Sequence, residues 1–214
     1  MTGVVLAAGA GRRMKEMRSS EGDPALLGRP KLLLLLDGRP LLAWVLSLVE
    51  RLPLAERVIV LGAEAQAIRQ ALFPPHPGPL PQGGEGGGRW RIVINEDWPE
   101  GIGASLRRAA EEVEGGMLLF LGDMPWVPEA GARAVLARAG DRPVALSYRG
   151  QRGFPVYLPP SLGPGLLVLA GDVGARDLLA DCELIPWDDP GVIRDVDVAD
   201  DLGQPQRCLR RSCL

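Results

Sequence analysis

Histidine and cysteine are scarce in this sequence, and each scarcity argues against a class of chemistry. The 214 residues include one histidine, His76, and three cysteines, Cys182, Cys208 and Cys213. His76 lies in a stretch dense in proline and glycine, which argues against a histidine general base or a histidine-ligated metal. An odd number of cysteines without metal-ligand spacing is typical of free thiols in a reducing compartment. We therefore expect a cytoplasmic protein.

Strong charge of one sign and long apolar segments are also lacking. The 24 Lys and Arg residues against 27 Asp and Glu give a formal net charge of −3, which provides no general attraction for nucleic acid or an anionic membrane. The longest candidate for a membrane span, Leu41 to Val49, is far shorter than the roughly 20 residues that a bilayer requires. No basic leader precedes the first apolar segment, so we expect no secretory signal.

The order of apolar and polar segments predicts the fold class. Short apolar runs with strand character alternate with stretches of helical periodicity. Strands that alternate with helices in this way are typical of a mostly parallel sheet covered on both faces. We expect one α/β domain over residues 1–214, in three layers. The expected strands are 4–7, 57–61, 91–95, 117–121, 143–148 and 154–158, and the expected helices are 41–51, 64–72, 103–113, 128–139 and 172–180.

Two segments interrupt this alternation. Residues 73–89 are dense in proline and glycine and carry few side chains that could be buried. Such a segment cannot offset the entropy of ordering it, so we expect a disordered surface insertion. It resembles a translated interspersed repeat element, which implies an insertion without function, and a PxxP-type ligand for a partner domain is the alternative. Residues 15–29 form a second, polar insertion.

The first expected strand leads into a glycine-rich turn. Gly9 and Gly11 follow it, and Arg12 and Arg13 come next. Small residues let backbone N–H groups approach a polyphosphate, and an adjacent cation offsets its charge. The turn lacks the Gly-Lys-Ser/Thr ending of a Walker loop, and Met14 stands where a dinucleotide fingerprint has its third glycine. An ordinary strand-to-helix turn is the alternative.

Asp123 is the sharpest candidate for a functional acid. It follows the apolar run 117–121, and open α/β sheets bind ligands beyond the carboxyl ends of their strands. A carboxylate there suits Mg²⁺, which takes one or two carboxylates together with substrate phosphates. The alternative is a helix cap or a turn, in which aspartate is also common.

Two further segments carry candidate polar groups. The block Asn95 to Leu106 narrows at small residues and places Ser105 near the start of an expected helix, a favourable site for an anion. Asp195 and Asp197 alternate with valines, so we expect them to share one face of a strand. They are candidates to complete a metal site or, equally, solvated residues at an edge.

Taken in order, these motifs resemble the nucleotidyltransferases of molybdenum-cofactor maturation, a branch of the Rossmann-like, glycosyltransferase-A-like nucleotidyltransferase superfamily. The resemblance covers nearly the whole chain. It rests on Leu-Ala-Ala-Gly-x-Gly-x-Arg-Met at 6–14, Pro-Lys-Leu at 30–32, the Asn-to-Ser-Leu block at 95–106, Asp-Met-Pro at 123–125, Gly-Phe-Pro-Val at 153–156, Gly-Asp-x-Gly-Ala-Arg at 171–176 and Asp-x-Asp at 195–197.

The resemblance implies an activity and assigns roles to particular residues. It implies transfer of CMP from CTP to the terminal phosphate of a molybdopterin-type acceptor, with release of pyrophosphate and dependence on Mg²⁺ or Mn²⁺. The implied catalytic residues are Arg13, Lys31 and Asp123. The implied nucleotide-binding residues are Leu6, Ala7, Ala8, Gly9, Gly11, Arg13, Lys31, Asn95 and Ser105. The implied acceptor-binding residues are Gly153, Phe154, Pro155, Gly174 and Arg176, and the implied metal ligands are Asp123, Asp195 and Asp197.

The identities of both substrates depend on single positions. Ala8 favours CTP, because guanylyl-transferring relatives usually have a second glycine there. The sequence departs from the cytidylyl members at Phe154, where they usually carry histidine, and in the insertion before Lys31. A guanylyltransferase, a transferase acting on another sugar or alcohol phosphate, a dinucleotide-binding oxidoreductase and a non-catalytic nucleotide-binding module are the alternatives. The family also implies a transient contact with a molybdoenzyme.

Overall fold

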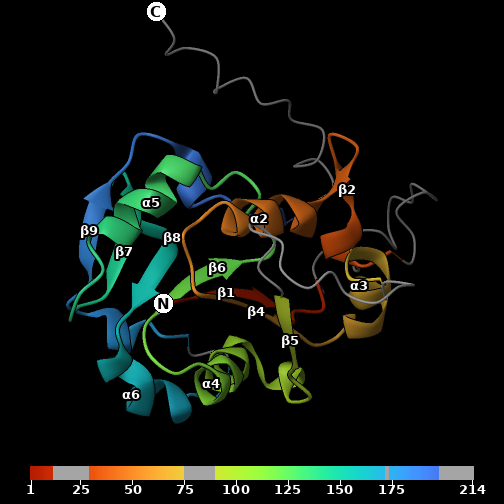
Figure 1. The fold of residues 1–214 in the computed structure, drawn as a ribbon, viewed down its shortest axis with the longest axis horizontal. Helices are drawn as coiled ribbons and strands as arrows, with labels where there is room; N and C mark the ends of the chain where they lie inside the picture. Colours follow the sequence, from red (N-terminus) through yellow and green to blue (C-terminus); the bar gives the residue numbers. More distant parts are fainter. Residues whose placement is uncertain (12–28, 75–89, 172–173, 198–214) are drawn as a thin grey trace, which may run out of the picture.

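The computed structural model describes residues 1–11, 29–74, 90–171 and 174–197. Its centre is a seven-stranded sheet in the order β5-β4-β1-β6-β8-β7-β9 (Figure 1). The strands are β1 (Thr2–Ala7), β4 (Glu56–Leu61), β5 (Trp90–Ile94), β6 (Met117–Leu121), β7 (Val144–Tyr148), β8 (Gln151–Leu158) and β9 (Glu183–Pro186). β8 pairs antiparallel with β6 and β7, whereas β1, β4, β5 and β6 pair parallel to one another and β7 pairs parallel to β9.

Helices cover both faces of this sheet, which confirms the expected α/β class (Figure 1). They are α2 (Leu41–Glu50), α3 (Ala65–Leu72), α4 (Ile102–Glu112), α5 (Glu129–Ala137) and α6 (Gly163–Leu167). α2, α3 and α5 contribute to one hydrophobic core, and α4 and α6 to the other. A small hairpin of β2 (Leu35–Leu36) and β3 (Arg39–Pro40) precedes α2.

The alternation of side chains along β1 accounts for the two cores. Val5 and Ala7 pack into the core beneath α2, while Val4 and Leu6 pack into the core beneath α4. Successive side chains of a strand point to opposite faces, so a strand covered on both faces must be apolar throughout. This is the reason that a continuous apolar run at 4–7 predicts a central strand rather than an edge strand.

The ladder along β8 is interrupted where its proline lies. Val156 pairs with Ala145 of β7, but the next pair towards the start of β8 is Arg152 with Ser147, and the register shifts between them. Pro155 has no N–H to donate to a ladder, so an irregularity is expected there. The peptide bond between Phe154 and Pro155 is cis. The irregularity leaves Gly153 and Phe154 outside the regular pairing.

Some expected elements differ from the observed ones. Within the described residues of 172–180, only a 3₁₀ turn at Asp177–Leu179 forms, so the expected helix there is wrong. Asp195 and Asp197 lie in irregular chain rather than on a strand, which corrects a second expectation. The sequence pattern also missed β9 and α6, because the first carries Pro186 and the second Gly163 and Pro164.

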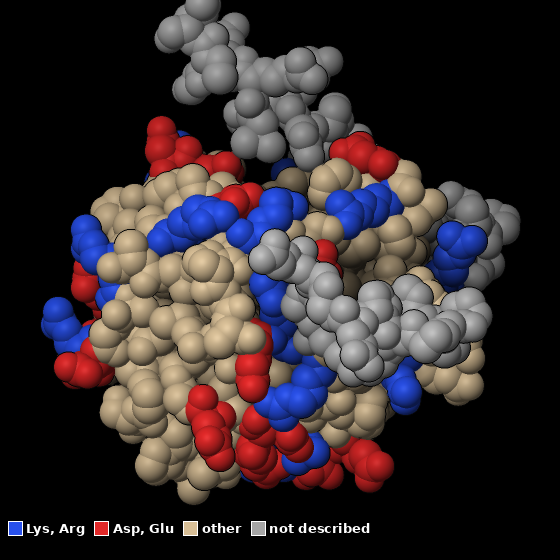
Figure 2. All heavy atoms as spheres, in the orientation of Figure 1, with Lys and Arg blue, Asp and Glu red and all other residues tan. Residues whose placement is uncertain are grey.

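The surface carries charges of both signs. Basic and acidic side chains are interspersed over the described part of the face in Figure 2. In the described ranges, no helix combines the length and apolar character that crossing a bilayer requires. Most of the insertion at 15–29 and of the segment 73–89 lies outside the described residues, as do His76, Cys208 and Cys213.

Candidate functional site

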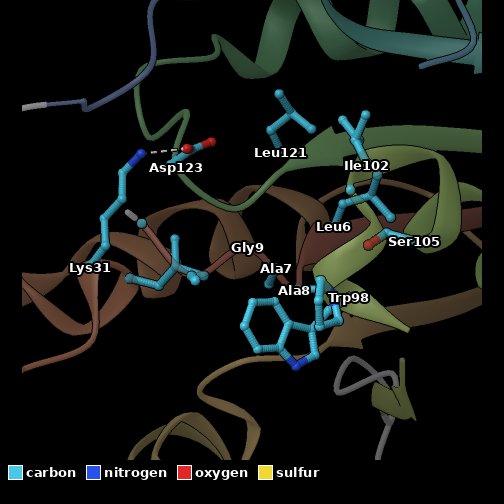
Figure 3. A pocket seen from close by; sticks show the side chains of 15 residues that line it. Leu6, Ala7, Ala8, Gly9, Lys31, Trp98, Ile102, Ser105, Leu121 and Asp123 are labelled. Atoms are coloured by element: carbon cyan, nitrogen blue, oxygen red, sulfur yellow. Dashed lines mark hydrogen bonds and ion pairs between the residues drawn. The ribbon is translucent and has the colours of Figure 1, made fainter. Parts of the chain in front are cut away.

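A pocket of about 390 Å³ opens at the carboxyl ends of β1 and β6 (Figure 3). β1 pairs with β4 on one side and β6 on the other, so the order of the strands reverses here. Open α/β sheets place ligands at such a reversal point. The pocket is lined by Leu6, Ala7, Ala8, Gly9, Ala10, Gly11, Lys31, Leu32, Trp98, Pro99, Gly101, Ile102, Ser105, Leu121 and Asp123.

The glycine-rich turn forms the floor of this pocket next to Lys31. Gly11 has φ of +58°, a left-handed conformation that glycine adopts without steric cost. A Cβ at Gly11 would lie 3.0 Å from Cβ of Lys31, so a larger residue would press against that side chain. The turn therefore brings unobstructed backbone close to the cation that the sequence predicts for phosphate binding.

Lys31 and two aspartates form a charged cluster at one end of the pocket. Lys31 Nζ donates to Asp123 Oδ2 at 2.7 Å and lies 3.5 Å from Asp197 Oδ1. The backbone N–H of Val196 donates to the carbonyl of Asp123 at 3.0 Å. That bond explains how the segment near the end of the chain is held beside the loop after β6. Lys31 begins the 3₁₀ turn Lys31–Leu33, which packs against α2.

Asp195 experiences the negative charge of this cluster. Burial, followed by the charges of Asp197 and Asp123, raises the pKa of Asp195, while Lys31 opposes the shift. The carboxyl of Asp195 therefore holds its proton to a higher pH than an isolated aspartate does.

Two carboxylates of the cluster, those of Asp123 and Asp197, could hold a divalent cation, whereas the described residues contain no group of three potential ligands, so Asp195 does not join them. Carboxylate oxygens of Asp123 and Asp197 both lie within 3.5 Å of one ammonium nitrogen, so they converge on a single positive charge. Mg²⁺ and Mn²⁺ prefer oxygen ligands and are commonly held by one or two carboxylates together with substrate phosphates.

The opposite end of the pocket is formed by the loop before α4. Asn95, which is 2% exposed, donates from Nδ2 to Ser105 Oγ at 3.1 Å and accepts from the N–H of Asp97 at 3.1 Å. Ser105 lines the pocket, whereas Asn95 lies behind it and fixes the loop. The hydroxyl of Ser105 accepts from Asn95 and so retains its own hydrogen for a ligand. Trp98 of this loop packs close to Ala8 around Gly62.

A second pocket, of about 630 Å³, contains most of the expected acceptor residues. Gly153, Phe154, Gly174 and Arg176 all line it, although 153–154 and 174–176 come from separate segments. Pro155 is buried and does not belong to the lining. Ile102 lines both pockets, so they adjoin at the first residue of α4. The rest of the lining is mainly apolar, with Arg152 and Asp177 as further charged members.

Several pocket residues were not predicted from the sequence. Trp98 and Ile102 lie inside the block at 95–106, but an apolar residue in a loop or at the start of a helix resembles a core residue until its neighbours are known. Arg152 precedes the Gly-Phe-Pro-Val motif by one position and carries no signal beyond that proximity. Arg13, expected to bind phosphate, lies outside the described residues.

Comparison with known proteins places this architecture in a family. A family model described as MobA-like NTP transferase domain matches residues 3–186. Nicotine blue oxidoreductase of Paenarthrobacter nicotinovorans is 33% identical over 94% of each chain. The purine catabolism protein PucB of Bacillus subtilis is 25% identical over 98% of this chain and 97% of its own.

Solved structures agree with the family assignment. Rv0371c of Mycobacterium tuberculosis superposes with a TM-score of 0.70 and 26% identity, covering 94% of this chain and 93% of its own. That protein was also solved in complex with manganese. A nucleotidyl transferase of Methanothermobacter, Mth528, shares the fold with a TM-score of 0.75 and 24% identity, covering 94% and 93% of the two chains. The chain belongs to the MobA-like NTP transferase family and is a nucleotidyltransferase.

Proposed function

We propose that this nucleotidyltransferase transfers CMP from CTP to the terminal phosphate of molybdopterin, in a reaction that depends on Mg²⁺ or Mn²⁺. The observation that supports this most directly is the pair of pockets that adjoin at Ile102. One combines the glycine-rich turn with the cluster of Lys31 and Asp123 and suits a nucleoside triphosphate. The other is mainly apolar and holds two arginines, Arg152 and Arg176, and suits a ring system with an anionic group.

The residues of the first pocket divide between phosphate and base. Backbone N–H groups at Gly9 and Gly11 would bind the triphosphate, with Lys31 and Arg13 neutralising its charge. Asp123 and Asp197 would hold the divalent cation, with Asp195 nearby. Leu6, Ala7, Ala8 and Ser105 would line the site of the base, and Asn95 would hold Ser105 in place.

The chemistry requires positioning and charge neutralisation rather than a general base. A phosphate oxygen of the acceptor attacks the α-phosphorus of CTP, a phosphorus–oxygen bond forms, and the bond to the pyrophosphate oxygen breaks in line. A phosphate monoester is already ionised at neutral pH, so no residue has to remove a proton. Lys31 and the glycine N–H groups stabilise the charge on the triphosphate as pyrophosphate leaves. A bound divalent cation would supply further neutralisation of that charge.

The second pocket would orient the acceptor towards this centre. Gly153, Phe154, Gly174 and Arg176 would contact it, with Pro155 supporting the turn of β8. Phe154 supplies an aromatic face where cytidylyl relatives usually carry histidine, so stacking on a planar ring would replace a polar contact. In this proposal the enzyme is cytoplasmic and passes its product to a molybdoenzyme by transient contact.

Pyrophosphate release tests the proposal. The purified protein is incubated with Mg²⁺ and Mo-molybdopterin and with CTP, GTP or ATP in turn, and Asp123→Ala serves as the blank. Release with CTP alone supports the proposal, and release with GTP overturns the assignment of the base.

A thermal-shift experiment covers the remaining alternatives. If CTP and Mg²⁺ raise the melting temperature but no pyrophosphate is released, the nucleotide binds and molybdopterin is not the acceptor. Stabilisation by NADPH, without stabilisation by any of the three nucleotides, would favour an oxidoreductase of this fold, since a ligand stabilises the state that binds it.

A further inference from the structure

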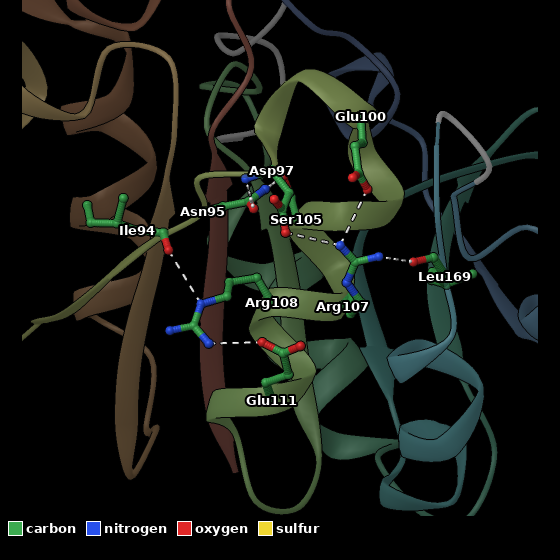
Figure 4. Close-up of polar contacts among 9 residues, drawn as sticks. All are labelled: Ile94, Asn95, Asp97, Glu100, Ser105, Arg107, Arg108, Glu111 and Leu169. Atoms are coloured by element: carbon green, nitrogen blue, oxygen red, sulfur yellow. Dashed lines mark hydrogen bonds and ion pairs between the residues drawn. The ribbon is translucent and has the colours of Figure 1, made fainter.

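The guanidinium of Arg107 on α4 bridges two separate segments, one of which forms a wall of the first pocket (Figure 4). Its Nη1 donates to the carbonyl of Leu169 at 3.1 Å. Its Nη2 lies 3.3 Å from Asp97 Oδ2 and 3.4 Å from Glu100 Oε2. One planar group thus contacts the loop before α4 on one side and the end of the α6 region on the other.

The loop that Arg107 holds forms a wall of the nucleotide pocket. Trp98, Pro99 and Gly101 of this loop line that pocket. Asp97 precedes them, and Glu100 lies between Pro99 and Gly101. Asn95 fixes the start of the loop through the N–H of Asp97. Arg107 adds a contact to the middle of the loop, where Asn95 does not reach.

The segment on the other side of Arg107 packs against the start of α4. Leu169, Ala170 and Gly171 pack against α4, and the N–H of Gly103 donates to the carbonyl of Gly171 at 2.9 Å. A Cβ at Gly103 would lie 2.8 Å from that carbonyl oxygen and 2.9 Å from the carbonyl oxygen of Ala170, so the approach requires glycine. Gly174, which lines the second pocket, lies close to Ile102.

Gly103 and Arg107 are one helical turn apart and therefore share a face of α4. Together they donate to two carbonyls of the 169–171 segment. We propose that Arg107 is a positioning residue that couples the nucleotide wall at 97–101 to the segment 169–171, so that binding of the nucleotide orders that segment. The name of the nucleotide wall rests on the proposed function above. The forked guanidinium suits this task because it can donate in two directions at once, which a single ammonium does less well.

Arg108, the next residue of α4, offers a matched control. Like Arg107, its guanidinium contacts two carboxylates and one backbone carbonyl. The carboxylates are those of Glu111 and Glu112, and the carbonyl is that of Ile94. These partners lie on α4 and β5, away from the 169–171 segment (Figure 4). Replacing Arg108 therefore removes a similar set of interactions without touching the bridge.

Amide hydrogen exchange tests the coupling without any assay of turnover. In the nucleotide-free protein, Arg107→Ala is expected to speed exchange on the order of tenfold on both sides of the bridge. The reporting amides are Glu100 and Gly101 on one side, and Gly103 and Leu169 on the other. Unchanged amide exchange in β1 is the control that the core of the variant stays folded. Acceleration on one side only, or equal acceleration in Arg108→Ala, would overturn the proposal.

A second experiment repeats the hydrogen-exchange measurement after addition of CTP with Mg²⁺. In the wild-type protein, CTP is expected to slow exchange at Glu100 and Gly101 directly and at Leu169 through Arg107. In Arg107→Ala, the protection at Leu169 is lost while that at Glu100 and Gly101 persists. Protection of Leu169 by CTP in Arg107→Ala would overturn the coupling. If CTP protects neither side of the wild-type protein, the proposed nucleotide is wrong, and the nucleotide-free comparison still decides the role of Arg107.

Gly103→Ala serves as the second variant. It is expected to displace the 169–171 segment while leaving Glu100 bonded to Arg107. Because coupling is reciprocal, exchange should be faster at Leu169 and Gly103 and also, through Arg107, at Glu100. Unchanged exchange at Glu100 would contradict the coupling.

Discussion

The ammonium of Lys31 lies 2.7 Å from a carboxylate oxygen of Asp123, although 92 positions separate the two residues. The pair also joins two motifs that carry little specificity alone, a Pro-Lys dipeptide and an aspartate after a strand. Their contact at the carboxyl ends of β1 and β6 turns two weak patterns into one site for a charged ligand.

Loss of the Asp123 carboxylate is expected to abolish turnover without unfolding the protein. In Asp123→Ala, the rate of pyrophosphate release should fall by at least about 100-fold. Loss of a residue that only hydrogen-bonds to a metal ligand already lowers metal affinity or activity by about 10- to 100-fold, and Asp123 would be a ligand itself. Steady-state kinetics and circular dichroism provide the two measurements. Asp188→Asn is the control, since Asp188 is exposed beyond β9 at the far edge of the sheet. Near-normal rates in Asp123→Ala would remove Asp123 from the mechanism.

Lys31→Met is expected to separate metal binding from catalysis. Without the ammonium, the carboxylates of Asp123 and Asp197 lose a positive charge within 3.5 Å. The nucleotide-free variant should therefore bind Mn²⁺ more tightly, on the order of tenfold, while turnover falls. Titration calorimetry with Mn²⁺ measures the first effect. Unchanged or weaker Mn²⁺ binding would show that these carboxylates do not hold the cation.

Ala8→Gly is expected to weaken discrimination against GTP. Ala8 lines the pocket, and its methyl group is buried against Gly62 close to Trp98, so glycine there would loosen this wall of the pocket. Removing one methyl group from a specificity pocket changes relative kcat/KM by about tenfold or more. The ratio of kcat/KM for CTP and GTP is the measurement. The same ratio in both proteins would contradict a role for Ala8 in base selection.

Arg57→Met is expected to destabilise the fold rather than the chemistry. Arg57 is 8% exposed, and its guanidinium donates to the carbonyls of Val49, Glu50 and Leu52 at the end of α2. Methionine fills a similar volume but removes three hydrogen bonds from a charged donor, at a cost of about 2–4 kcal/mol, although the carbonyls of Val49 and Leu52 keep backbone donors.

Urea denaturation measures the cost of this substitution. Arg69→Met, at an exposed position of α3, is the comparison and should change the free energy of unfolding by no more than about 0.5 kcal/mol. An equal effect of the two substitutions would show that Arg57 does not cap α2.

Asp195→Asn is expected to alter the dependence of stability on pH. The pKa of Asp195 is raised in the folded protein, so the folded state binds more protons than the unfolded state between the two pKa values. The free energy of unfolding contributed by this group therefore falls as pH rises through that range. In EDTA, the variant should be more stable than the wild-type protein at pH 7, and the difference should disappear below the ordinary value of 3.8. A difference that grows towards acid pH would contradict this sign.

Local pattern was sufficient for the central strands and the helices that cover them. The apolar run at 4–7 and the periodicity at 41–51 predict β1 and α2 within one or two residues, because a strand buried on both faces is apolar throughout and a helix buried on one face is apolar at helical spacing. The prediction of a helix at 172–180 was wrong. Residues 177–179 form a short 3₁₀ turn whose apolar side chains pack into the core beneath α4. Periodicity does not distinguish such a turn from a helix.

The sequence by itself determined the class of fold, the family and the residue types at the site. Apolar periodicity and ordered motifs are properties of short stretches of chain, so they can be read without a structure. Only the tertiary structure decided that Asp197 lies beside Lys31 and that Arg107 contacts two separate segments at once. Both relationships depend on backbone hydrogen bonds and packing between distant segments, and no local pattern records which segments will meet.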